Sequence, residues 1–111
     1  MIRNGTQVVY ETRGDVLVIR VGGEIDHHSA VAVRTGIDAR LTAERPMRVM
    51  LELSAVDFMD SSGLGLIMGR FALIKQYGGT LAVLDPSAAV LRIIKLAGME
   101  RMVSILRTKK N

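Results

Sequence analysis

The chain has 111 residues, of which 49% are hydrophobic and 23% charged, and this length and composition predict one folded domain. It contains no cysteine, which excludes disulfide bridges and thiolate metal sites, and its longest uncharged stretches are nine residues, far short of the ~20 apolar residues that cross a bilayer. The net charge of +4 comes from scattered basic residues without interleaved aromatic ones, so nucleic acid is not an expected partner. Polar sequence follows Met1 to Arg3 where a signal peptide would have its apolar region, so we expect a cytoplasmic protein.

A β-hairpin and a helix are predicted in the first part of the chain. The strands are two runs of mostly β-branched residues, 7–12 and 16–21, on either side of an Arg-Gly-Asp turn. The helix follows Asp26 or Ser29, either of which is a favoured N-cap. Its apolar residues recur at every fourth position and predict one stripe against the core, made of Val33, Ile37 and Leu41.

Two central strands with a helix between them are predicted in the middle of the chain. Residues 48–53 and 80–84 are short apolar runs bounded by polar or turn residues, which is typical of strands inside a sheet. Residues 63–77 form the strongest predicted helix, and Gly78 and Gly79 end it because glycine tolerates the left-handed backbone of a helix C-terminus.

A third helix and a last strand complete the prediction. Asp85 is the expected N-cap, with Pro86 at the first helical position and Gly98 at the end of the helix. Residues 103–106 are the last short strand. Strands that alternate with helices after an opening hairpin predict one α/β domain over residues 1–111, with a mixed β-sheet and a core from about residue 7 to residue 106.

The helix at 63–77 has two contrasting faces on a helical wheel. The predicted core-facing arc holds large apolar side chains, namely Leu64, Ile67, Met68, Phe71 and Ile74. The opposite arc is made of small residues between two leucines, with Ser62 at its upper end, and comprises Gly65, Gly69, Ala72, Leu66 and Leu73. Solvated helix faces carry Lys, Glu and Gln, so this surface suggests a protein partner, or a second element of the same domain packed against it.

Ser61 and Ser62 precede this helix at the position where N-caps lie, and each is a candidate cap. One hydroxyl of the pair would also lie on an exposed turn at the positive end of the helix dipole, where backbone N–H groups favour a phosphate. Asp57 and Asp60 are near enough in sequence to orient a hydroxyl or a magnesium ion during phosphoryl transfer. The local sequence permits phosphorylation without requiring it.

Two motifs resemble those of a known family. Residues 23–30 read Gly-Glu-Ile-Asp-His-His-Ser-Ala, and residues 58–70 read Phe-Met-Asp-Ser-Ser-Gly-Leu-Gly-Leu-Ile-Met-Gly-Arg. Both resemble the STAS-domain anti-anti-sigma factors, and within them the branch that acts on the sigma-F switch of sporulation. The likeness runs in register from about Val8 to Leu106. It implies a STAS-like fold, a mixed sheet with helices, in a regulatory protein rather than an enzyme.

The resemblance also implies a partner switch. The unphosphorylated form would bind an anti-sigma factor that is also a serine kinase and so release the sigma factor; phosphorylation at Ser61 would switch the protein off, and a PP2C-type phosphatase would reset it. Ser61 is the first serine of the pair, which is the acceptor position of the family. Together with the small-residue surface, the expected partner-binding residues are Asp26, Ser61, Ser62, Gly65, Leu66 and Gly69.

Other functions fit the sequence less well. The glycines at 63, 65 and 69, with Asp85 beyond them, resemble a loosened dinucleotide fingerprint, but they do not directly follow a predicted strand and too little chain remains after Asp85. Neither serine of the pair has the glycine two residues before it that a nucleophile elbow requires. His27 and His28 are adjacent and point in different directions, which is a weak metal site. We therefore expect no cofactor, no metal and no catalytic site.

A different role within the same family remains the main alternative. The chain would then be a STAS module of a stressosome or of a lipid-transport complex. Binding to a cognate anti-sigma kinase distinguishes these roles from a partner switch.

Overall fold

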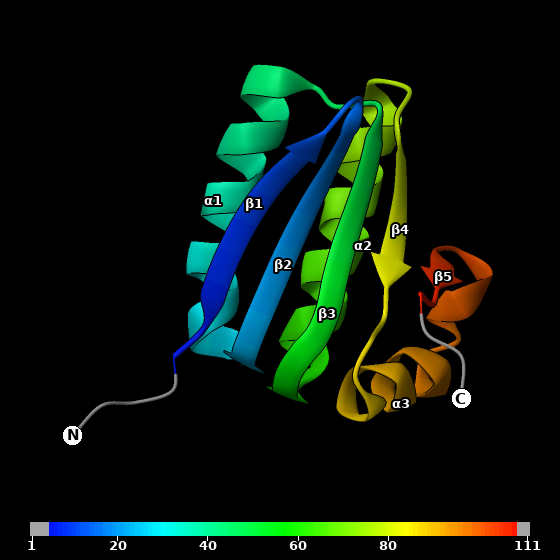
Figure 1. The fold of residues 1–111 in the computed structure, drawn as a ribbon. Coiled ribbons are helices and arrows are strands. Elements are labelled where there is room, and N and C mark those ends of the chain that lie inside the picture. Colours follow the sequence, from blue (N-terminus) through cyan, green and yellow to red (C-terminus); the bar gives the residue numbers. More distant parts are fainter. Residues whose placement is uncertain (1–4, 109–111) are drawn as a thin grey trace.

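A five-stranded sheet with two long helices on one face forms the frame of the molecule (Figure 1). The computed structural model describes residues 5–108. Along the chain the elements are β1 (Gln7–Arg13), β2 (Val16–Ile25), α1 (His27–Glu44), β3 (Arg48–Met59), α2 (Ser61–Gln76), β4 (Thr80–Leu84), α3 (Ala88–Leu96), the short 3-10 helix η1 (Met99–Arg101) and β5 (Ser104–Leu106). Among the helices of this described part, none is long and apolar enough to cross a membrane.

The strands lie in the sheet in their chain order, from β1 to β5. β1 pairs with β2 antiparallel, and the pairs that follow are all parallel, which confirms the predicted opening hairpin and mixed sheet. α1 connects β2 to β3, and α2 connects β3 to β4. Because crossovers between parallel strands are right-handed, two successive crossovers in one direction put both helices on the same face (Figure 1).

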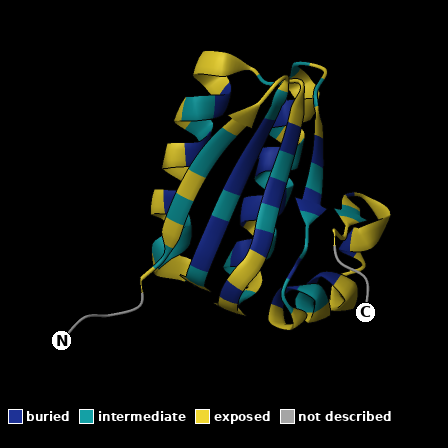
Figure 2. Cartoon of the chain, in the orientation of Figure 1, coloured by how far each residue is buried: buried dark blue, intermediate teal, exposed yellow. Residues whose placement is uncertain are grey.

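The core lies between the sheet and the two helices. Side chains alternate across a strand, so on β2 Leu17, Ile19 and Val21 face the helices and are buried. The predicted stripe of α1, made of Val33, Ile37 and Leu41, is also buried and is confirmed. Figure 2 shows buried residues along the central strands and exposed residues on the outer surface of α1. Each buried leucine or isoleucine of this core contributes roughly 1.5–3 kcal/mol to folding.

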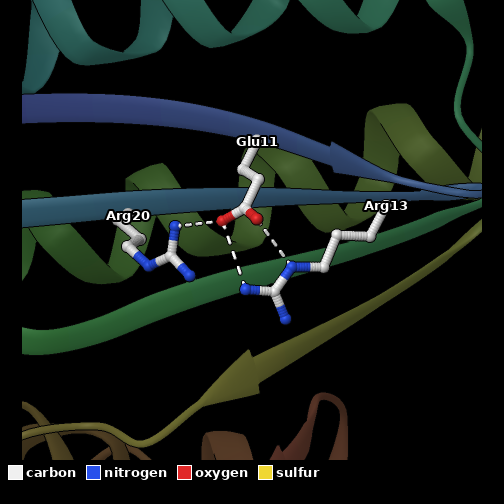
Figure 3. Close-up of polar contacts among 3 residues, drawn as sticks. All are labelled: Glu11, Arg13 and Arg20. Atoms are coloured by element: carbon white, nitrogen blue, oxygen red, sulfur yellow. Dashed lines mark hydrogen bonds and ion pairs between the residues drawn. The ribbon is translucent and has the colours of Figure 1, made fainter.

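The opposite face of the sheet carries charged side chains. Glu11 on β1 lies between two guanidinium groups, at 2.7 Å from Nε of Arg13 and 2.7 Å from an Nη atom of Arg20 (Figure 3). The register explains the contact, because Glu11 pairs with Val18 and is therefore a diagonal neighbour of Arg20 on the same face. The hydrogen bonds from Arg13 and then from Arg20 lower the pKa of Glu11 to about 2. All three side chains are partly exposed, so the pairs contribute little to stability.

The start of the third helix differs from the prediction. α3 is capped by Ser87, whose hydroxyl oxygen accepts the Val90 N–H at 3.3 Å, and not by Asp85. Asp85 has a left-handed backbone, with φ of 47°, and its carboxylate accepts the N–H of Thr108 at 2.8 Å and the Thr108 hydroxyl at 2.5 Å. Its own N–H donates to the Leu106 carbonyl of β5. Asp85 therefore ties the last strand to β4, and that role separates it from the helix.

Candidate functional site

Two helix N-termini meet at one end of the sheet. β2 and β3 are neighbouring parallel strands, and a helix begins directly after each of them. Ile25 pairs with Met59, and the N–H of Asp60 donates to the Ile25 carbonyl at 3.2 Å. The residues that follow the two strands, Asp26 and Asp60, are therefore neighbours in space. This arrangement brings together the two sequence motifs (Figure 1).

Asp26 is the N-cap of α1. Its Oδ1 atom accepts the N–H groups of His28 at 3.0 Å and of Ser29 at 2.9 Å. The Ser29 hydroxyl oxygen in turn accepts the Asp26 N–H at 3.0 Å, so the two candidate caps act together as a capping box. These hydrogen bonds, above all the one from the Ser29 N–H, lower the pKa of Asp26 below its usual range. Asp26 is thus a charged group in a fixed place beside α2.

Asp60, and neither serine, is the N-cap of α2. Its carboxylate accepts the N–H of Ser62 at 2.8 Å. The prediction that Ser61 or Ser62 caps the helix is wrong because β3 pairs with β2 as far as Met59, which makes Asp60 the last extended residue before the helix. α2 accordingly begins at Ser61 rather than at the predicted Gly63.

The two serines differ in their surroundings. Ser61 is exposed, and its hydroxyl makes no hydrogen bond to any residue between 5 and 108. Ser62 is half-buried, and its N–H donates a hydrogen bond to the Asp60 carboxylate. Because the cap is provided by another residue, the Ser61 hydroxyl is left accessible for chemistry.

A groove separates the first turns of α1 and α2. It has a volume of about 250 Å³ and is lined from both helices by His27, Ala30, Val31, Arg34, Ser62, Gly65 and Leu66. The residues from α1 were missed by sequence reasoning, since a sequence does not show which helix lies beside α2. The signal that would have found them is the spacing of His27, Val31 and Arg34, which places these residues on one face of α1.

The small-residue face of α2 is open. Gly65 and Ala72 are exposed, and a Cβ atom added to Gly65 or Gly69 would meet no atom within 4 Å among the described residues. The alternative that this face packs on another element of the same domain therefore does not hold at these two glycines. Gly63 is different, because a Cβ atom there would overlap the side chain of Met59.

Leu66 does not belong to the exposed part of that face. It is only 4% exposed and packs in the core with Ile67 and Ile74. The prediction of an exposed Leu66 is wrong, while Ile67 and Ile74 face the core as expected. The helix is turned so that its fully buried residues are Gly63, Leu66, Ile67, Arg70 and Ile74. α2 packs against α1 as well as the sheet, so the side of Leu66 is covered by α1 and forms the floor of the groove.

Metal ligands are not grouped at this site. Within residues 5–108 no three side chains of His, Cys, Asp or Glu stand close enough to hold a metal ion. Asp57 is exposed on β3, and Asp60 is used as a cap. His27 lines the groove, and His28 contributes its N–H to the Asp26 cap.

The chain is similar to proteins of one family over nearly its whole length. The family model described as the STAS domain matches residues 7–111. The anti-sigma F factor antagonist of Paenibacillus polymyxa is 37% identical over 105 residues, which are 95% of this chain and 90% of that protein. The solved structure of the anti-sigma factor antagonist SpoIIAA in its unphosphorylated form has a TM-score of 0.80 and 26% identity, over 94% of this chain and 90% of that one. The phosphorylated form from Bacillus has a TM-score of 0.73 and 25% identity, over 94% and 93%. On this evidence the chain belongs to the STAS domain family.

Proposed function

We propose that this protein is an anti-sigma-factor antagonist and that phosphorylation of Ser61 switches it off. Similarity to proteins with that name over more than nine-tenths of the chain supports the general role. The single observation that supports the switch is the environment of Ser61. This serine is exposed at the first position of α2, and Asp60 is the N-cap of the helix. A kinase can reach this hydroxyl without opening the helix.

The binding surface proposed for the anti-sigma factor surrounds Ser61 and is called the docking surface below. It consists of Asp26, Ser61, Ser62, Gly65, Gly69 and the groove between α1 and α2. The open space beside Gly65 and Gly69 lets a partner backbone approach α2 closely. Leu66 remains part of the proposal as the floor of the groove and not as an exposed contact.

Phosphorylation would act on binding through charge. A phosphate adds about 1.5–2 negative charges, and a helix N-terminus exposed to water accommodates them. A partner that covers the same turn would have to remove water from those charges, which costs several kcal/mol unless cations pair with them. The phosphorylated form is therefore the one that releases the partner.

The partners follow from this cycle. The anti-sigma factor is itself the serine kinase, and a PP2C-type phosphatase removes the phosphate. The protein acts in the cytoplasm as a binding protein and as a kinase substrate, and it catalyses no reaction itself.

The test is incubation with Mg-ATP and the cognate anti-sigma factor, followed by mass spectrometry of the intact chain and of its peptides. We expect one added phosphate, at Ser61, in the parent and in the matched control Ser62→Ala, and none in Ser61→Ala. Ser61→Ala should still bind the anti-sigma factor. Phosphate on Ser62 would contradict the assignment within the pair. A chain that neither binds nor is phosphorylated, and instead joins a large assembly, would have a stressosome or transport role.

A further inference from the structure

An ion pair between a buried arginine and a partly exposed aspartate joins the two helices that form the groove. Arg70 on α2 is only 7% exposed. Within residues 5–108 it is the one charged residue that is buried. Its Nε atom lies 2.8 Å from Oδ1 of Asp38 on α1, and an Nη atom lies 3.4 Å from the Leu66 carbonyl. Burial lowers the pKa of Arg70, the Asp38 carboxylate raises it, and the guanidinium of Arg34 lowers it again. Arg70 therefore holds its charge against desolvation chiefly through Asp38.

The pair lies next to the groove. Asp38 is one turn beyond Arg34 on α1, and Arg70 is one turn beyond Leu66 on α2. Arg34 and Leu66 line the groove from its two sides. Each partner of the ion pair thus lies one helical turn beyond a residue that lines the groove.

Stability alone gives a poor reason for such a pair. Neither Asp38 Oδ1 nor Arg70 Nε is reached by solvent, and apart from their mutual contact neither has a hydrogen-bond partner within the described residues. Removing water from the Arg70 guanidinium and from Asp38 Oδ1 costs roughly as much as their attraction returns, so an apolar pair of similar size would serve stability equally well. An ion pair is directional, however, and it favours one alignment of α1 against α2, whereas apolar side chains repack in several ways.

We propose that Asp38 and Arg70 are positioning residues of the docking surface. Their contact fixes the spacing of α1 and α2, and with it the width of the groove and the position of Ser62 and Gly65 relative to Asp26. This inference rests on the proposed function, since it assigns the pair to the binding of the anti-sigma factor.

The decisive variant removes both charges at once, so that neither is left buried and unpaired. Asp38→Leu combined with Arg70→Met should melt at the parental temperature or above it. Its affinity for the anti-sigma factor, titrated well below the melting temperature, should fall about tenfold. The backbone amide chemical shifts of Ser62 and Gly65 should move in the free protein. The single variant Arg70→Lys, which keeps the charge opposite Asp38, should bind more tightly than the double variant. The control Lys75→Met, which removes an exposed cation of the same helix, should bind like the parent.

Two readouts separate the inference from the function on which it rests. If the double variant binds like the parent, or if the Ser62 and Gly65 amides keep their parental shifts, the positioning role is wrong. If the double variant is less stable than the parent, and the loss of affinity is no larger than its unfolded fraction explains, the pair has only a structural role and the inference is also wrong. A parent that does not bind the anti-sigma factor refutes the proposed function instead, and the amide shifts of the free protein then still decide whether the pair sets the geometry of the groove.

Discussion

Two glycines of α2 stand two residues apart and have different surroundings. A Cβ atom at Gly63 would overlap Met59, whereas at Gly65 it would project into open space. Gly63 is therefore required by packing within the domain. Gly65 has no such requirement, although glycine inside a helix costs ~1 kcal/mol relative to alanine. Close approach of a partner at the proposed docking surface would account for a glycine at this position.

Gly65→Ala should therefore stabilise the free protein and impair its binding. We expect the free energy of unfolding to rise by up to ~1 kcal/mol, since the helix gains propensity and nothing is displaced. Affinity for the anti-sigma factor should fall because the added methyl group blocks close approach. Denaturant unfolding and a binding titration measure the two effects. The matched control Gly63→Ala should lower stability, and a stabilised Gly65→Ala that binds normally would remove Gly65 from the docking surface.

Glu11 leads to a prediction about pH. Its pKa falls from an ordinary value of 4.5 to about 2 in the folded protein because Arg13 and Arg20 donate to the carboxylate. A carboxyl group with a lower pKa in the folded state stabilises the fold above the unfolded pKa and loses that contribution as pH falls. The window is therefore pH 4.5 down to 2, and the effect is small because the group is exposed. NMR titration of the Glu11 carboxyl carbon should give a midpoint near pH 2. A midpoint near pH 4.5 would mean that Arg13 and Arg20 do not donate hydrogen bonds to the Glu11 carboxylate. In Glu11→Gln the unfolding free energy should lose this part of its pH dependence.

At the scale of the element, α2 faces three surroundings at once. Its inner side packs on the sheet, one flank packs on α1, and the surface that carries Gly65 and Ala72 is exposed; α2 also has a smaller contact with α3. Ile67 and Ile74 occupy the inner side, and Leu66 fills the flank toward α1. The small residues Gly65 and Ala72 lie on the exposed part of the helix, whereas Gly63 is buried against Met59.

A lysine scan of α2 distinguishes these sides. Leu66→Lys should unfold the domain or cost several kcal/mol, because it removes a buried side chain and buries an unpaired charge. Ala72→Lys should change the free energy of unfolding by less than about 0.5 kcal/mol, since Ala72 is exposed. Circular dichroism melts of both variants measure the contrast. Equal stability of the two variants would mean that α2 is rotated relative to the structure described here.

At the scale of the whole molecule, the order of the strands brings the residues of the candidate site together. Asp26 and Ser61 are 35 positions apart in the chain, and they meet because β2 and β3 are adjacent and parallel. Parallel neighbours end at the same edge of a sheet, so the helices that follow them begin side by side. The core lies behind this edge. Among residues 5–108 its one buried charged residue, Arg70, is on the third turn of α2 and not beside Ser61.

Phosphorylation of Ser61 should accordingly leave the fold intact. We expect chemical-shift changes confined to the starts of α1 and α2 and a melting temperature close to that of the parent, because the added charge is solvated at an exposed helix end. Binding to the anti-sigma factor should weaken at the same time. Large shift changes across the central strands in the phosphorylated protein would show that the switch works by refolding instead.

What the sequence by itself determined was local. The hairpin, the order of strands and helices, and the buried stripe of α1 follow from residue periods that act within one element, and they are confirmed. The two motifs were enough to identify the family, which the family match confirms. Tertiary structure alone decided three points about α2: its cap at Asp60, its buried side at Leu66 and its contact through Arg70 with Asp38. The cap depends on where β3 stops pairing with β2, and the other two depend on α1 as a neighbour. A helical wheel does not include these neighbours, so it gave no position to the buried Arg70 and treated the core residue Leu66 as exposed.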